Sequence, residues 1–167
     1  MIALRRRLLP EADRNRYVAG SAFDLGWMDQ LAAAGGDSVL VVAEAVLRYF
    51  EEALVRGLIV ALRRRFPGAE LVTDVCTPLA VRLDNLHLLV TGSKARMRCA
   101  VGDPRELEAW GPGIRLVESF PYFGDPEPRM GLPSWFGRIP PLNRATTIQR
   151  FNLGPPPREA WTSGPPP

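Results

Sequence analysis

The sequence predicts an α/β protein built on a doubly wound, mostly parallel sheet with helices on both faces. Residues 39–43 form a short apolar, β-branched run that follows the turn residues Gly35, Gly36 and Asp37, as expected of a strand buried on both faces. Residues 51–65 carry the clearest helical periodicity in the chain. Strand and helix patterns then alternate, which is typical of a parallel sheet in one domain.

The acid at the end of the first central strand is the leading functional candidate. Glu44 follows Ala43 directly, and open α/β sheets bind ligands beyond the carboxyl ends of their strands. A solvated acid at a strand exit is the alternative interpretation, and the local pattern leaves both open.

The charged residues at the two ends of the helix predicted over 51–65 stand where a helix favours them. Leu54, Leu58 and Leu62 recur every four residues, acids stand at its start and Arg63–Arg65 at its end. This distribution complements the helix dipole, so these charges need no ligand.

The remaining elements are predicted in chain order from similar signals. We expect a helix over 2–9 that Pro10 ends, a strand over 17–22 and a helix over 25–34 with Asp24 as its N-cap. Further expectations are strands at 70–75, 114–120 and 146–153, and helices at 78–89 and 103–110. A loop rich in proline and glycine spans 121–141, and a proline-rich tail, residues 154–167, is expected to be disordered after a domain of residues 1–153.

Composition argues against several classes of protein. The 21 basic and 18 acidic residues give a net charge of only +3 and are interleaved, so no nucleic-acid footprint is indicated. No apolar stretch is long enough to cross a membrane, and the first ten residues do not form a signal peptide. One histidine and two cysteines without metal spacing predict no metal site and two reduced thiols in a cytoplasmic protein.

Three segments resemble the leucine carboxyl methyltransferase family, and its bacterial tetracenomycin-type polyketide O-methyltransferase branch in particular. They are Ser21-Ala-Phe-Asp-Leu-Gly-Trp-Met-Asp29, Val41-Val-Ala-Glu-x-Val-Leu-x-Tyr49 and Asp103-Pro-Arg-Glu-Leu-Glu-Ala-Trp110. The resemblance runs from about residue 1 to residue 153 and implies a Rossmann-like class I methyltransferase fold that binds S-adenosylmethionine.

The resemblance also implies cofactor contacts. Asp24 would accept a hydrogen bond from the adenine amino group and the Leu25 N–H would reach a ring nitrogen. Glu44 and Ala45 would lie near the methionine end of the cofactor, with Tyr49 in the wall beside the methyl group. Trp27, Tyr122 and Trp135 are the candidate substrate-binding residues. The loop from Tyr122 to Trp135 is interpreted either as a substrate lid or as an anchor to the helix layer.

Two family elements have no counterpart in the chain. The glycine-rich loop after the first strand and the acid after the second are absent, so we expect a fold truncated before strand 3, without strands 1 and 2. Met1 stands where the family often has valine, which suggests a GTG codon read as a start inside a longer frame. The strand at 39–43 would then become a sheet edge, which is prone to association. We expect the chain either to form a homodimer through this edge, to let residues 17–22 slide across and fill the gap, or to be unstable.

The leading functional hypothesis is therefore methyl transfer from S-adenosylmethionine to a carboxylate or hydroxyl of a small, polyketide-like molecule. The alternative is an inactive remnant that acts as a binding or dimerisation module. No catalytic base is assigned, although His87 and Glu44 are offered for a phenol or enol. His87 stands among Leu86, Leu88 and Leu89, which favours a packed helix histidine.

Overall fold

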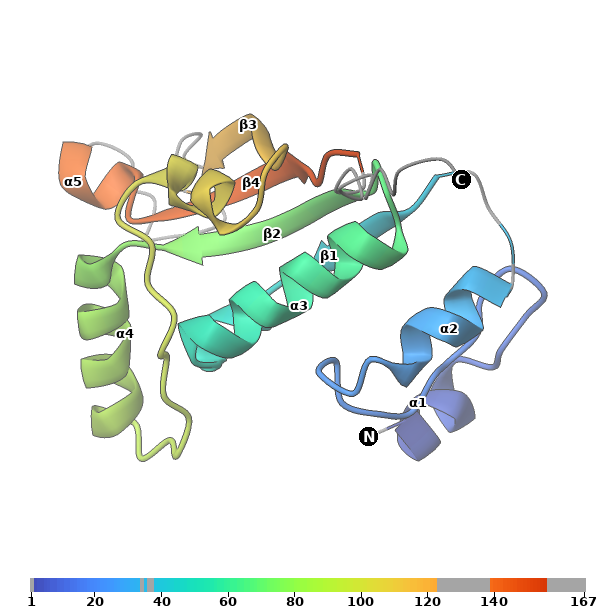
Figure 1. The fold of residues 1–167 in the computed structure, drawn as a ribbon. Helices are drawn as coiled ribbons and strands as arrows, with labels where there is room; N and C mark the ends of the chain where they lie inside the picture. Colours follow the sequence, from blue (N-terminus) through green and yellow to red (C-terminus); the bar gives the residue numbers. More distant parts are fainter. Residues whose placement is uncertain (1, 34, 36–37, 123–138, 156–167) are drawn as a thin grey trace, which may run out of the picture. The chain divides into compact units, whose positions relative to one another are not determined.

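The computed structural model describes residues 2–33, 35, 38–122 and 139–155 and has an α/β architecture. The chain divides into two compact units, Met1–Gly35 and Gly36–Pro167. Each is described by itself (Figure 1). The division into a domain of residues 1–153 and a tail stays a prediction, and of that tail the structure describes only Gly154 and Pro155.

The first unit contains two helices joined by a long loop. Helix α1 is Ile2–Leu8, as predicted, and α2 is Gly26–Ala33. The strand predicted over 17–22 is wrong, because these residues have no strand conformation. Side chains, and not a neighbouring strand, bind the backbone polar groups here. Tyr17 N–H donates to Glu11 Oε1 at 2.6 Å, and the Arg6 guanidinium donates to the Tyr17 carbonyl at 3.1 Å.

The second unit contains a four-stranded sheet in the order β1-β2-β4-β3 among the described residues. The strands are β1 (Leu40–Ala43), β2 (Glu70–Cys76), β3 (Arg115–Pro121) and β4 (Thr146–Asn152). Strand β1 pairs with β2 in parallel, whereas β4 is antiparallel to both β2 and β3. The prediction of a mostly parallel sheet is therefore wrong. The return of the chain from β3 into the neighbouring β4 produces an antiparallel pair, a geometry that needs no helical crossover.

Strand β1 is the edge of the described sheet, as predicted. Its expected burial on both faces is wrong, because Leu40 is 60% exposed and Val42 is 64% exposed. An edge strand has only one neighbour to cover it, so an apolar sequence does not by itself guarantee burial.

Helix α3 (Glu52–Arg65) follows the short 3-10 helix η1 (Leu47–Tyr49) and covers one face of the sheet (Figure 1). Val55, Leu58, Ile59 and Leu62 are its buried apolar residues. Each such side chain contributes roughly 1.5–3 kcal/mol when fully removed from water. The parallel pairing of Ala43 with Thr73 places the carboxyl ends of β1 and β2 side by side.

Helix α4 (Pro78–Val90) begins immediately after β2 (Figure 1). Thr77 caps it by accepting a hydrogen bond from Ala80 N–H at 3.3 Å, with Pro78 in the first turn. The helix predicted near Asp103 is the 3-10 helix η2 (Pro104–Trp110), with Asp103 and Glu106 forming a capping box. Helix α5 (Pro140–Asn143) precedes β4. None of the helices in the described ranges is long and apolar enough to span a membrane.

Candidate functional site

A cavity of about 880 Å³ lies at the carboxyl ends of β1 and β2. Its volume is in the range of small-molecule sites. The lining residues come from the two strand ends, α4 and the segments around α5 and β4, and include Val42, Glu44, Ala45, Arg48, Val72, Asp74, Leu83, Asp84, His87, Tyr122, Leu142 and Ile148. Val42, Val72 and Ile148 alternate with the buried Leu71 and Phe151 along the strands, so they point to the opposite face of the sheet.

The turn after β1 is held in an unusual conformation. Ala45 has φ +53°, the only non-glycine residue with positive φ in the described ranges, in a region that costs a side-chain-bearing residue about 1–2 kcal/mol. Its N–H donates to Asp74 Oδ1 at 2.6 Å, and Thr73 Oγ1 donates to the Ala43 carbonyl at 3.0 Å. These two bonds join the turn to the end of β2.

The same Asp74 carboxylate pairs with Arg48 at the base of the cavity. The Arg48 Nε to Asp74 Oδ2 distance is 3.0 Å, and the two side chains are 19% and 6% exposed. Burial is the largest single influence and lowers the pKa of Arg48, but Asp74, Cys76 and Tyr49 together outweigh burial and raise that pKa above its ordinary value. The guanidinium and the Asp74 carboxylate therefore neutralise each other.

Three other ionisable residues line the cavity without a side-chain partner among the described residues. Glu44 and His87 are exposed, and Asp84 is half-buried. Asp84 and His87 are one turn apart on α4 and therefore share a helix face. The interpretation of His87 as a packed helix histidine is wrong, because its side chain is exposed.

Three of the residues predicted from the sequence meet at this cavity. The adjacent residues Glu44 and Ala45 line it together with Tyr122, which comes from a distant segment of the chain. Tyr49 instead packs against a buried cluster that includes Cys76, Ala80 and Met97. Its contact with a cofactor stays a prediction.

Three other predicted residues belong to the first unit, and one lies outside the described residues. Asp24, Leu25 and Trp27 belong to the first unit, where Trp27 Nε1 donates to the Ala22 carbonyl at 3.0 Å. Their participation in a site with Glu44 stays a prediction. Trp135 lies outside the described residues, as does most of the predicted loop.

Asp74, Arg48 and Asp84 are not among the site residues predicted from the sequence. Asp74 could have been noticed as a single acid inside the apolar strand Leu71–Val75, where a charge needs a partner. Arg48 is one of many arginines in the chain, and nothing in the local pattern distinguishes it. Asp84 can be recognised as a site residue only from the structure, which places α4 beside the strand ends.

The described sheet and its helices form an α/β methyltransferase-like fold. A protein of the DUF574 family from Streptomyces avermitilis has a similar structure, with a TM-score of 0.59 and 17% identity over 90% of this chain and 60% of that one. A proposed methyltransferase from Thermobifida fusca gives a TM-score of 0.56 and 15% identity, over 92% of this chain and 59% of the other. At these identities the likeness shows the fold alone.

The resemblance noted in the sequence is confirmed by a characterised protein. The chain is 29% identical to the tetracenomycin polyketide synthesis O-methyltransferase TcmP of Streptomyces glaucescens, over 92% of its own length and 58% of the relative. It thus spans little more than half of that enzyme. No family model matches the chain.

Proposed function

We propose that the chain carries part of the active site of an S-adenosylmethionine-dependent O-methyltransferase that acts on a small molecule. The observation that carries the proposal is the cavity at the carboxyl ends of β1 and β2, where Glu44 and Ala45 meet Asp74 and α4. Ligands bind at this edge in open α/β sheets. The similarity to an O-methyltransferase supplies the reaction class. Both cysteines are free thiols, which suits the cytoplasmic setting we propose.

The residues of the cavity fit this cofactor. S-adenosylmethionine supplies a methyl group on a positively charged sulfonium, and its methionine end carries an ammonium group that S-adenosylhomocysteine shares. The Glu44 carboxylate is exposed and has no cationic side chain paired with it among the described residues, so it can face that ammonium. Glu44 and the adjacent Ala45 would hold the methionine end, and Asp24 and Leu25 are proposed to hold the adenine. The protein's own contribution is to orient the two reactants and to exclude water.

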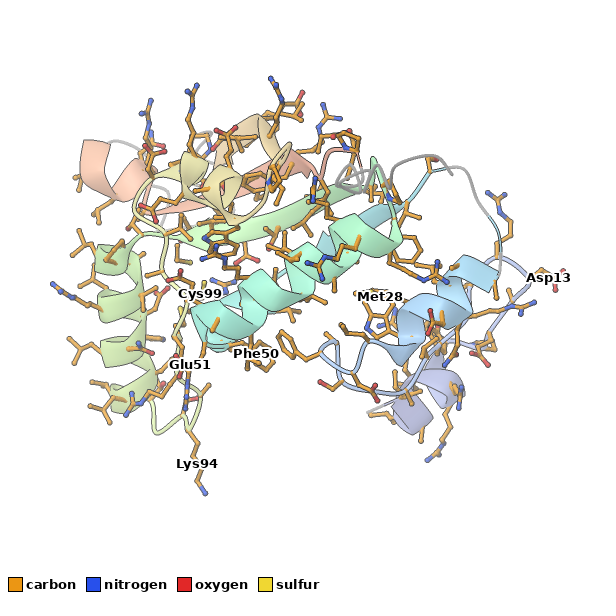
Figure 2. All side chains as sticks on the ribbon, in the orientation of Figure 1. Asp13, Met28, Phe50, Glu51, Lys94 and Cys99 are labelled. Atoms are coloured by element: carbon orange, nitrogen blue, oxygen red, sulfur yellow. The ribbon has the colours of Figure 1, made fainter. Side chains whose placement is uncertain are left out.

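Calorimetry with S-adenosylhomocysteine tests the proposal on the full chain. We expect saturable binding that Glu44→Gln weakens by about tenfold, or ~1.4 kcal/mol. Asp13→Asn is the control for a lost carboxylate, because Asp13 is exposed and points away from the rest of its unit (Figure 2). Absence of binding by the unmodified chain would contradict the proposal.

Strand β1 supports a second candidate, a module that self-associates. Its outer edge is unpaired within the described sheet, and Leu40 is 60% exposed, which makes it a template for a strand from a second copy. Analytical ultracentrifugation should then show a dimer that Leu40→Lys disrupts. Val90→Lys on α4 is the matched control, since Val90 is 78% exposed. A monomer at all concentrations excludes this candidate.

A further inference from the structure

Helix α4 presents an apolar face that nothing in the described part of the chain covers. Five of its large apolar side chains are between 46% and 78% exposed, namely Leu79, Leu83, Leu86, Leu89 and Val90. The residues that α4 buries are Ala80 and Val81. A surface helix normally turns such an apolar stripe toward its own core. An apolar patch that faces outward instead marks a site of interaction, and we call this one the outer face of α4.

The spacing of these residues matches a helical partner. One stripe recurs at alternating intervals of four and three residues: Leu79, Leu83, Leu86 and Val90. This is the spacing along which one helix packs against another in a coiled coil. The 13 residues of α4 give this seam a length of about 20 Å. An amphipathic helix laid along α4 would bury the seam.

The charge beside the outer face is positive. Residues 78–98 comprise α4 and the segment that follows it, and they hold a single acid, Asp84, and four bases: Arg82, Lys94, Arg96 and Arg98. The charge of this range equals the net charge of +3 of the whole chain, so the remaining residues contain as many acids as bases. A partner that docks here is therefore attracted through its negative charge.

Three of these four bases have no ion-pair partner among the described residues. Arg98 pairs with Glu51 at 2.7 Å. No such pair involves Arg82, Lys94 or Arg96 in the described ranges, and all three are exposed. The Arg96 guanidinium donates to a backbone carbonyl at 3.2 Å, and Lys94 projects outward from the loop after α4 (Figure 2). These three cations can therefore pair with carboxylates of a partner.

We infer that the outer face of α4 docks an acidic amphipathic helix of a partner protein. This surface goes beyond the proposed function and does not depend on it. A second copy of the chain fits poorly, because two outer faces would bring like charges together. An anionic membrane fits less well than an acidic helix. A helix that lies on lipid carries its basic residues along its polar face, whereas α4 has one arginine, Arg82, and the other two unpaired cations lie beyond its end.

Fluorescence anisotropy of labelled peptides mixed with the full chain tests this docking. The acidic probe is a peptide of about three heptads with leucine at positions a and d and glutamate at e and g, and the basic probe has lysine in place of glutamate. We expect the acidic peptide to bind about tenfold more tightly than the basic one, and its affinity to fall as salt is added. A scrambled acidic peptide of the same composition should bind as weakly as the basic one, because it has no seam.

A substitution in the seam measures the apolar contribution. Leu86→Ala should weaken binding of the acidic peptide about tenfold, because it removes a central contact of the seam. Leu54→Ala is the matched control, since Leu54 is a similarly exposed leucine on helix α3. This control should leave the affinity for the acidic peptide unchanged.

A double variant measures the contribution of charge. Lys94→Gln with Arg96→Gln should weaken binding of the acidic peptide about tenfold and reduce its dependence on salt. Arg56→Gln with Arg64→Gln removes the same charge from exposed positions of α3 and should change the affinity less than about twofold. All of these variants change exposed side chains, so circular dichroism should show an unchanged fold.

Several results would overturn the inference. They are equal binding of the acidic and scrambled peptides, binding of no peptide, and equal effects of the variants on α3 and of those on α4 and its loop. Binding of the chain to phosphatidylserine vesicles in place of the acidic peptide would assign the outer face to a membrane and would overturn it as well.

Discussion

The backbone N–H of Ala45 donates a 2.6 Å hydrogen bond to the Asp74 carboxylate, joining the turn after β1 to the end of β2. Asp74 uses its other oxygen for Arg48. One buried carboxylate thus holds a left-handed turn, neutralises a guanidinium and sets where Glu44 leaves the sheet. The shape of the cavity entrance depends on this residue.

Two substitutions of Asp74 should destabilise the protein to different extents. Asp74→Asn keeps an oxygen for Ala45 N–H but leaves Arg48 without its counter-charge, so we expect a loss of about 2–3 kcal/mol, below the range for fully buried pairs. Asp74→Ala also removes the acceptor and should cost about 1–2 kcal/mol more. Urea denaturation measures both changes. Equal stability of the two variants would show that the Ala45 hydrogen bond contributes nothing.

The left-handed conformation of Ala45 predicts opposite effects for two substitutions. Glycine relieves a strain of about 1–2 kcal/mol but makes the unfolded chain more flexible, so Ala45→Gly should stabilise the protein by about 0.5–1 kcal/mol. Ala45→Val should destabilise it, because a β-branched residue tolerates positive φ poorly. The shift in the urea midpoint checks both, and destabilisation by glycine would contradict the explanation.

Replacing two glycines of the second unit with alanine should change the stability of the protein in opposite directions. Gly154 has φ +73°, and a Cβ there would overlap the carbonyl group of Gly113, so Gly154→Ala should cost about 2 kcal/mol or more. Gly57 lies on the exposed side of α3, and a Cβ there meets nothing within 4 Å. Gly57→Ala should stabilise the helix by about 1 kcal/mol. Thermal unfolding of the matched pair distinguishes the two sites.

We expect the folded protein to lose stability at alkaline pH because the Cys99 thiol is buried. This buried residue lies near the start of α3 (Figure 2), and its burial, with a contribution from Glu52, raises its pKa from 9.0 to about 11. The unfolded chain therefore releases this proton first as the pH rises. The stability contributed by the neutral thiol is complete below pH 9 and is lost between about pH 9 and pH 11.

Urea denaturation across that interval, compared with Cys99→Ala, isolates this contribution. The variant should lose less stability between these pH values than the unmodified protein, whatever its stability at neutral pH. Part of the decline should persist in the variant, because burial also raises the pKa of Cys76. Identical declines in the two proteins would exclude the explanation.

Local patterns predicted most of the elements of the second unit. Strand β1, helix α3 and helix α4 lie within one residue or two of their predicted bounds, because periodicity and capping are properties of nearby residues. The strand predicted at residues 17–22 is wrong because a short local run such as Tyr17–Ala19 describes only a potential strand, whereas pairing needs a neighbour elsewhere in the chain.

The sequence by itself determined the α/β class, the positions of α1 to α4, the resemblance to O-methyltransferases and the choice of Glu44 as a candidate site residue. The tertiary structure alone decided that Asp74 reaches Ala45 and Arg48, that α4 brings Asp84 and His87 to the same cavity, and that β1 is exposed. Propensities act between residues a few positions apart, whereas these residues are about 25 to 45 positions apart and meet only through the way the sheet and helices pack.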